Sequence, residues 1–291
     1  MYELMQVSAH DYYIQSPAKI GLVRLNDREV CLIDSGNDKD AGRRVKKVLD
    51  AEGWTLTAIY NTHSHADHIG GSRYLQGQTG CRVYAPGIEC AFTRHPVLEP
   101  AFLYGGYPAK DLRHKFLMAQ ESDARELTAQ ALPDGFSIIP LPGHALDMVG
   151  FRTPEGTVYL ADCLSSRETL DKYGIVFLYD VAAYLETLSM VKGLSANLFV
   201  PAHAPASEDI GDLAQYNIDK VLEIGERIVD LCGEPLCFEQ LLGRLFSLYG
   251  LTMNFEQYVL VGSAVRSYLA WLKDAGRIQA EFSDNMLLWR R

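Results

Sequence analysis

Short apolar runs alternate with helix-like segments over the first two thirds of the chain. Apolar runs of strand length, bounded by polar or glycine-containing turns, occupy residues 18–25, 29–34, 55–60, 82–85, 136–141, 147–153, 157–161 and 196–200. Apolar residues at helical spacing predict helices over 38–52 and 180–193, and we expect another at about 67–76. Strands that alternate with helices in two similar halves favour an α/β (α+β) protein.

Residues 86 to about 134 depart from this alternation. Prolines interrupt the segment repeatedly, and aromatic residues are frequent in it. Such a long connection between core strands is more often functional than idle. The segment is either a helical excursion that packs its rings onto the sheet or a lid over a functional site. We favour the lid, with Tyr104 and Tyr107 in Tyr104-Gly105-Gly106-Tyr107 as its mobile aromatic tip.

Beyond residue 205 the pattern changes to three helix-like stretches, at 211–232, 238–248 and 255–274, followed by a hairpin at 278–289. This order resembles a winged helix, so we divide the chain into a domain of residues 1–205 and a C-terminal winged-helix-like domain of residues 206–291. Winged helices often bind DNA, but residues 206–291 contain 8 Lys and Arg against 13 Asp and Glu. We therefore expect no nucleic-acid partner.

The whole chain is also acidic, with a net charge of −10 from 27 basic and 37 acidic residues. This charge argues against general affinity for nucleic acid or for an anionic membrane. No apolar run approaches the roughly 20 residues that span a bilayer, and the N-terminus lacks the basic flank and apolar core of a signal peptide. The six cysteines are scattered and form no Cys-x-x-Cys pair. We expect a cytoplasmic protein.

Three histidines and one aspartate crowd into six positions directly after the run 55–60, namely His63, His65, Asp67 and His68. An extended backbone would point His63 and His65 the same way. The alternative is a polar loop whose histidines only form hydrogen bonds, but unpaired neutral rings waste donors and acceptors, and charged rings repel. A divalent cation removes both problems, because neutral imidazole and ionised carboxylate are its natural ligands. The stretch therefore predicts a metal site.

The segment Thr62-His63-Ser64-His65-Ala66-Asp67-His68 resembles the His-x-His-x-Asp-His signature of the metallo-β-lactamase-fold hydrolases. Three further ligands of that family have candidates here in the right order, each after a strand-like run: His144, Asp162 and His203. The resemblance implies a four-layer αββα sandwich with metal ions at one edge. Within the superfamily, the motif is similar to that of the thioester hydrolases related to glyoxalase II.

The resemblance also implies two divalent metal ions, with zinc as the first choice and iron or manganese as alternatives. Carried over position by position, one ion would be held by His63, His65 and His144 and the other by Asp67, His68 and His203, with Asp162 bridging the two. A hydroxide bridging the ions would attack a carbonyl or phosphoryl centre. Asp67 would orient this hydroxide or take its proton, which makes it the candidate catalytic residue.

Two further positions bear on the metal site. Asp34 ends the run 29–34 and is either a turn residue or, as the resemblance implies, a support behind the metals that orients a ligand histidine. Family members often follow the third ligand with Thr-x-Gly-Ser, whereas Ala145-Leu146-Asp147-Met148 follows His144 here. This departure removes a hydroxyl from the site and could put Asp147 in its place, and it bears on the substrate class.

The leading hypothesis is a dinuclear metal-dependent hydrolase acting on an ester, thioester, lactone or phosphoester of a small molecule. One alternative on the same scaffold is a mono-iron oxidoreductase of the sulfur dioxygenase type, although such enzymes use one metal set and this chain supplies two. Another is a non-catalytic metal-binding regulatory protein that acts through its winged-helix-like end. A homodimer is compatible with the sequence.

Overall fold

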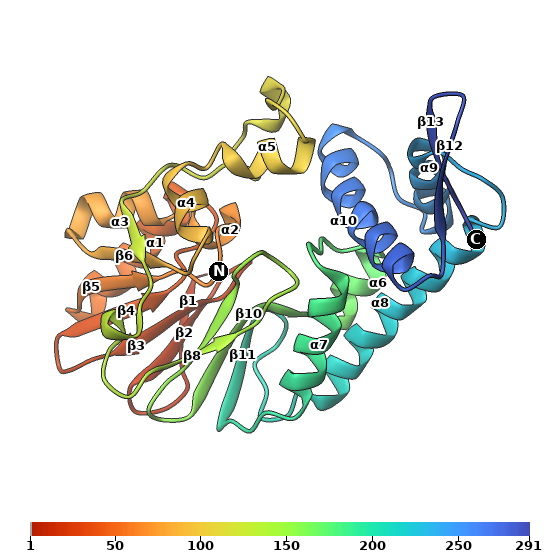
Figure 1. The fold of residues 1–291 in the computed structure, drawn as a ribbon. Helices are drawn as coiled ribbons and strands as arrows, with labels where there is room; N and C mark the ends of the chain where they lie inside the picture. The colour runs from red at the N-terminus through yellow and green to blue at the C-terminus, as the bar shows by residue number, and fades with distance from the viewer. Residues whose placement is uncertain (1) are drawn as a thin grey trace.

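The computed structural model describes residues 2–291, in which two large β-sheets pack against each other (Figure 1). The first sheet has the spatial order β1-β2-β3-β4-β5-β6-β7. Its strands are β1 (Glu3–Gln6), β2 (Asp11–Gln15), β3 (Ile20–Arg24), β4 (Glu29–Ile33), β5 (Thr55–Tyr60), β6 (Arg82–Ala85) and β7 (Ala124–Glu126). Strands β1 to β4 pair antiparallel, whereas β4 to β7 pair in parallel. The carboxyl ends of β4 and β5 therefore lie at the same edge of the sheet.

The second sheet has four strands in the order β11-β10-β9-β8. Its strands are β8 (Ser137–Pro140), β9 (Val149–Arg152), β10 (Thr157–Ser165) and β11 (Leu198–His203). One apolar cluster joins the two sheets, with Val23 and Tyr60 from the first and Phe151 and Tyr159 from the second. The side chains between the sheets are therefore a single shared core.

Helices cover the outer face of each sheet. On the first sheet these are α1 (Lys39–Glu52) and α3 (Ser72–Thr79), and on the second they are α7 (Val181–Lys192) and α8 (Gly211–Leu231). Val45 and Leu49 of α1 and Leu75 of α3 are buried against the first sheet because they recur at helical spacing. The predicted four-layer αββα sandwich is confirmed.

The predicted helix at 67–76 is wrong in one respect, because the structure divides it into α2 (Ala66–Ile69) and α3. Gly70 and Gly71 lie between the two helices, and their backbone approaches the backbone of residues 35–37, in the loop that follows β4, very closely. A Cβ atom on Gly70 would lie 2.3 Å from the carbonyl carbon of Asn37, and one on Gly71 would lie 2.3 Å from the carbonyl oxygen of Ser35. The two glycines are thus required by close backbone approach, which ties the metal-motif loop to the end of β4.

Two other local expectations also change. The strand expected at 157–161 continues to Ser165, through a shift of its register against β11 near Ala161. The pattern also misses β1, β2, β7 and α6 (Arg167–Tyr173). β1 and β7 are the edge strands of their sheet, and edge strands carry weaker apolar alternation than central ones.

The C-terminal part follows the predicted order of helices and hairpin. After α8 come α9 (Phe238–Leu248), α10 (Phe255–Asp274), β12 (Gln279–Ser283) and β13 (Met286–Arg290). Asp284 and Asn285 turn the hairpin with φ of 49° and 60°, the left-handed conformation that two-residue hairpin turns need. One core cluster contains Leu160 of β10 together with Val221 of α8, so apolar packing is continuous across residue 205. The division into domains at that point stays a prediction.

The segment at 86–134 contains α4 (Glu89–Arg94), α5 (Leu98–Tyr104) and the short 3₁₀ turns η1 (Lys110–Leu112) and η2 (Ala129–Ala131). It reaches from the first sheet to the C-terminal part, since α5 lies beside the start of α10 (Figure 1). Leu103 and Leu112 share a small core with Val259 of α10. None of the helices within residues 2–291 is both long enough and apolar enough to cross a lipid bilayer.

Candidate metal centre

The loop at 61–68 carries four of the predicted ligands and is held by backbone hydrogen bonds to three neighbouring segments. The amide of Asn61 donates to the carbonyl of Tyr84 at 2.8 Å, and the amide of Val149 donates to the carbonyl of Thr62 at 3.0 Å. The amide of Ser35 donates to the carbonyl of His68 at 2.7 Å. The loop is therefore fixed to both sheets, which gives its side chains defined positions before any ligand binds.

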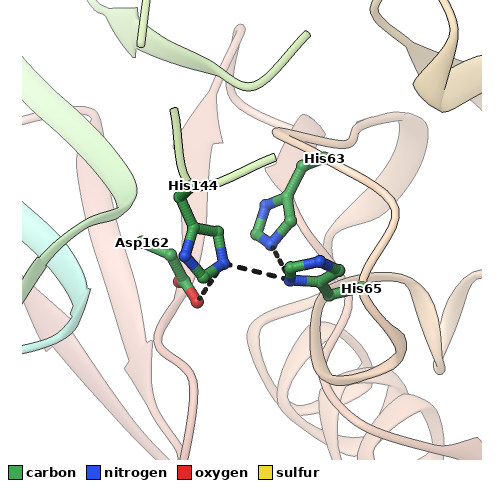
Figure 2. A group of neighbouring side chains, drawn as sticks. All are labelled: His63, His65, His144 and Asp162. Carbon is green, nitrogen blue, oxygen red and sulfur yellow. Dashed lines mark hydrogen bonds and ion pairs between the residues drawn. The ribbon is translucent and has the colours of Figure 1, made fainter. Parts of the chain in front are cut away.

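Three imidazole rings converge on one point in the first group of donors (Figure 2). His65 Nδ1 lies 3.0 Å from His63 Nε2 and also 3.0 Å from His144 Nε2. Burial lowers the pKa of His65 and of His144 to about 4, and it lowers the pKa of His63 well below its usual value. All three rings are therefore neutral near pH 7, and their lone pairs are available to a cation.

The second group combines Asp67, His68 and His203 with Asp162, which the first group also contains. His203 Nε2 lies 3.2 Å from Asp67 Oδ2 and 3.3 Å from Asp162 Oδ2. The Asp162 carboxylate raises the pKa of His203 to about 10. Burial would lower the pKa of His68, but the carboxylates of Asp162 and Asp67 outweigh it and hold that pKa well above its usual value. The negative charge of the carboxylates in this group therefore favours a positive charge among its donors, either a ring proton or a bound cation.

A bound cation would satisfy these donor atoms better than hydrogen bonds among them do. A single proton on His65 Nδ1 could serve only one of the two ring nitrogens beside it. His68 Nε2 and Asp162 Oδ1 are buried and form an ion pair at 2.9 Å, but within residues 2–291 neither atom makes a hydrogen bond of good geometry. Buried polar atoms without partners are costly. Metal ions placed among these groups would satisfy the orphaned atoms and supply the positive charge that otherwise has to come from ring protons.

Asp34 lies directly behind the second group. Its Oδ1 accepts the backbone N–H of Thr62 at 2.8 Å, its Oδ2 accepts the hydroxyl of Thr62 at 2.9 Å, and Oδ2 also lies 2.8 Å from His68 Nδ1. Asp34 is buried and adopts a left-handed φ of 65°, which costs energy for a residue other than glycine. The contact to His68 is the arrangement expected of a residue that orients a ligand histidine, rather than that of a simple turn residue.

Backbone strain recurs beside Asp162. Ala161, the residue before it, has a φ of 50°, and the pairing of β10 with β11 shifts register on both sides of Ala161. This bulge turns Asp162 into the site, whereas the next residue, Cys163, is fully buried in the apolar core. Cys163 is thus excluded as a metal ligand by its direction.

Glu89 on α4 is a site residue that sequence reasoning missed. Its carboxylate accepts the backbone N–H and the hydroxyl of Ser64, and it also accepts the backbone N–H of Asp147 at 3.1 Å. Asp147 in turn accepts the N–H of Ile88 at 2.8 Å. Glu89 therefore links the loop that carries His63 and His65 to the loop that carries His144. Asp147 is engaged at the start of α4, so it does not replace the missing hydroxyl.

Glu99 on α5 is the second residue that the sequence did not single out. Its Oε1 lies 3.5 Å from His65 Nε2, and burial raises its pKa to about 8. The aromatic ring of Phe177 stands edge-on to the rings of His65 and His144, with centroids 5.2 and 5.8 Å apart. Glu89 and Glu99 stand outside any motif of regularly spaced residues. Only an alignment of relatives or a structure could therefore identify them as part of the site.

The two aromatic residues proposed for a lid tip make other contacts. The ring of Tyr104 packs against that of Phe255 with centroids 5.9 Å apart. Tyr107 is 76% exposed and its hydroxyl accepts a hydrogen bond from Arg113. The seven predicted ligands thus lie together, whereas the contacts of Tyr104 and Tyr107 are with Phe255 and Arg113. A lid role for the two tyrosines stays a prediction.

Comparison with known proteins agrees with this geometry. The sequence model of the metallo-beta-lactamase superfamily matches residues 15–203, a span that contains all seven donors. A crystal structure of a beta-lactamase domain protein from Burkholderia ambifaria superposes on 99% of this chain and 93% of its own, with a TM-score of 0.74 at 16% identity. A metallo-beta-lactamase family protein from Thermus thermophilus covers 99% and 97%, with a TM-score of 0.72 at 18% identity. The shared fold therefore includes the C-terminal helices and hairpin.

Curated relatives share shorter stretches. A hydroxyacylglutathione hydrolase from Rhodopseudomonas palustris is 63% identical over 119 residues, which are 40% of this chain and 38% of that protein. A hydroxyacylglutathione hydrolase from Pseudomonas entomophila is 28% identical over 154 residues, which are 53% of this chain and 48% of that protein. The chain thus spans less than half the length of each of these two relatives.

Proposed function

The chain belongs to the metallo-β-lactamase superfamily, and on that premise we propose that it is a metal-dependent hydrolase of a small-molecule ester, thioester, lactone or phosphoester. The observation that carries the proposal is the convergence of two groups of four donors, His63, His65, His144 and Asp162 in one and Asp67, His68, Asp162 and His203 in the other. Within each group the donor atoms lie within 4.8 Å of one another, which suits two metal ions that share a carboxylate.

The proposed metal is zinc. His63, His65 and His144 would hold one ion, Asp67, His68 and His203 would hold the other, and Asp162 would bridge them. Histidine-rich sets with carboxylates are usual for zinc, and iron or manganese accept the same ligand types. When bound, such ions activate a water molecule and polarise the carbonyl or phosphoryl group that it attacks.

Asp67 is the proposed catalytic residue. Its side chain is 41% exposed, against 9% for Asp162, so it is the carboxylate of the pair that water and substrate can reach. Burial would raise the pKa of Asp67, but the rings of His68 and His203 lower it to about 2. The carboxylate is therefore ionised near pH 7, and it can accept a hydrogen bond from the attacking water and so orient it.

Thioesters are the first substrate class to test, because curated relatives carry the name hydroxyacylglutathione hydrolase. The alternative of a mono-iron oxidoreductase is not favoured, since that reaction needs one donor set and both sets are complete here. A purely regulatory metal-binding protein is not favoured either, because the curated relatives carry the name of a hydrolase. A homodimer and a cytoplasmic location stay predictions.

Metal analysis combined with a hydrolysis screen tests the proposal. Protein purified without chelator should contain two zinc ions per chain and should hydrolyse at least one member of a panel of thioesters, lactones, aryl esters and phosphodiesters. His65→Ala and Asp162→Ala should abolish turnover while the circular dichroism spectrum stays unchanged. His95→Ala, at an exposed histidine in the 86–134 segment, is the matched control and should keep full activity.

Three outcomes would count against the hydrolase. Full turnover in Asp162→Ala, or in metal-free wild type, would remove the proposed mechanism. One iron per chain with oxygen uptake would favour the oxidoreductase. Two metal ions with no turnover on any substrate class would favour the regulatory alternative.

A further inference from the structure

We propose that Glu99 is a positioning residue for the metal centre: it accepts a hydrogen bond from Nε2–H of His65 and so fixes this ring in the tautomer that binds metal through Nδ1. The inference rests on the metal site proposed above. It adds a contribution from α5, an element of the 86–134 segment, to a site whose donors otherwise come from strand ends and the 61–68 loop.

The orientation of the His65 ring is the first observation. Its Nδ1 faces inward, 3.0 Å from His63 Nε2 and 3.0 Å from His144 Nε2, so Nδ1 is the atom that joins the group of donors. A neutral imidazole that offers one nitrogen as a lone pair carries its proton on the other. The proton of His65 therefore belongs on Nε2, and the carboxylate oxygen of Glu99 lies on that side at 3.5 Å.

The environment of Glu99 is the second observation. Its side chain is 11% exposed. Within residues 2–291 its carboxylate makes no side-chain hydrogen bond and no ion pair other than the contact with His65. Burying a carboxyl group without a partner is costly, and such a group can accept an N–H whether it is ionised or neutral. Closing the 3.5 Å separation to ordinary hydrogen-bond length needs only a small movement of a flexible side chain. His65 is the ion-pair partner of Glu99 within residues 2–291.

The packing of α5 is the third observation. This helix has only seven residues, too few for its own stability, so tertiary contacts must hold it. Leu103 is buried in one cluster with Val259 of α10, and Phe177 packs against the same cluster. Phe177 also stands edge-on to the His65 ring. The ring therefore contacts both Phe177 and Glu99, and the elements that carry these two residues pack against the C-terminal helix α10.

Replacement of Glu99 by leucine tests the proposal, because leucine is of similar size but accepts no hydrogen bond. Zinc affinity of the full chain is measured by competition with a chromophoric chelator. In Glu99→Leu one of the two zinc ions should bind about 10- to 100-fold more weakly, and the other should bind as in wild type. Glu99→Gln keeps an acceptor oxygen and should recover most of the affinity. Glu121→Leu, at an exposed glutamate of the same segment, is the matched control and should bind both ions normally.

A spectroscopic measurement separates orientation of the ring from a general loss of structure. In zinc-loaded protein labelled with ¹⁵N-histidine, the signal that disappears in His65→Ala identifies the His65 Nε2–H group. This proton should be protected from solvent exchange in wild type and Glu99→Gln, and it should exchange faster in Glu99→Leu. Unchanged zinc affinity and exchange in Glu99→Leu would overturn the role of Glu99 and leave the metal site standing. If wild type binds no zinc, the metal site and the inference fall together.

Discussion

Glu89 accepts the backbone N–H of Ser64 at 3.0 Å and the hydroxyl of the same serine, and Ser64 stands between two of the proposed ligands. The other oxygen of Glu89 accepts the N–H of Asp147, three residues after His144. One buried carboxylate thus holds two loops that are far apart in the sequence. The spacing of the rings in the first group of donors depends on this link.

Glu89→Gln should therefore destabilise the protein and disturb the first group of donors. Three donors face this side chain, the N–H and hydroxyl of Ser64 and the N–H of Asp147. An amide has only one acceptor oxygen, so at least one of these donors would lose its acceptor or face the amide NH₂ group. We expect a loss of about 1–3 kcal/mol in the free energy of unfolding, measured by urea denaturation, together with weaker zinc binding. Glu126→Gln, an exposed position in the same segment, should change neither quantity. Equal stability of Glu89→Gln and wild type would contradict the link.

Asp34→Asn should weaken metal binding with little effect on backbone conformation. Asparagine tolerates the left-handed φ of 65° at this position, but its amide cannot accept from Thr62 twice and from His68 as well. Because outer partners of ligand histidines affect metal affinity, we expect about a 10- to 100-fold loss at the His68 ion. Asp27→Asn, in an exposed turn, serves as control in the same chelator competition. Wild-type affinity in Asp34→Asn would show that Asp34 is only a turn residue.

Removal of metal should lower the thermal stability of the whole chain. A ligand that binds only the folded state stabilises it by about 2.7 kcal/mol at 100 times its dissociation constant, which corresponds to a shift in Tm of about 4 °C per bound ion for a chain of this size. Calorimetry with chelator, and then with increasing zinc, measures the shift. In Asp162→Ala zinc should produce little of it, because both donor groups lose a shared member. A Tm that is independent of zinc in the wild type would argue against binding at this site.

Gly71→Ala should destabilise the fold, whereas Gly77→Ala should not. A Cβ atom at position 71 would lie 2.3 Å from the carbonyl oxygen of Ser35, but at position 77 of α3 nothing lies within 4 Å. Overpacking costs about 1–3 kcal/mol, while alanine in a helix gains about 0.5–1 kcal/mol over glycine. The two substitutions are the same in chemistry and close together in the chain, so chemical denaturation of the pair isolates the effect of close approach.

Glu155 should contribute stability that depends on pH in one defined window. The hydroxyl of Ser8, with the backbone and ring of His10, lowers the pKa of Glu155 from 4.5 to about 2. Because the folded-state pKa is the lower one, the contribution is fully present above about pH 4.5 and is lost as the pH falls towards 2. Glu155→Gln should therefore be less stable than wild type at pH 7, and most of this difference should be gone by pH 2. A stability difference that does not shrink on acidification would contradict this origin; Glu52→Gln, at an exposed position, is the control.

Short-range patterns were sufficient to determine much of this protein. The spacing of His63, His65, Asp67 and His68 predicted a metal site. The resemblance of that motif to the metallo-β-lactamase-fold hydrolases then pointed to His144, Asp162 and His203, and the structure brings all seven side chains into two groups. This works because parallel strands deliver their carboxyl ends to one edge of a sheet, so residues after strands meet even when they are far apart in sequence. Helix α1 was equally clear: the apolar spacing predicted it over 38–52, and it runs from Lys39 to Glu52 between Asp38 as N-cap and the left-handed Gly53.

Only the tertiary structure decided what surrounds those side chains. Glu89 and Glu99 sit in short helices of a segment without regular pattern, and each acquires its partner through packing of that segment against the loop at 61–68 or against α10. The break of the helix at Gly70 and Gly71 follows from close approach to residues 35–37, and the direction of Asp162 follows from a bulge against β11. Close approach, burial and register are relations between distant parts of the chain, so no local pattern of residues can encode them.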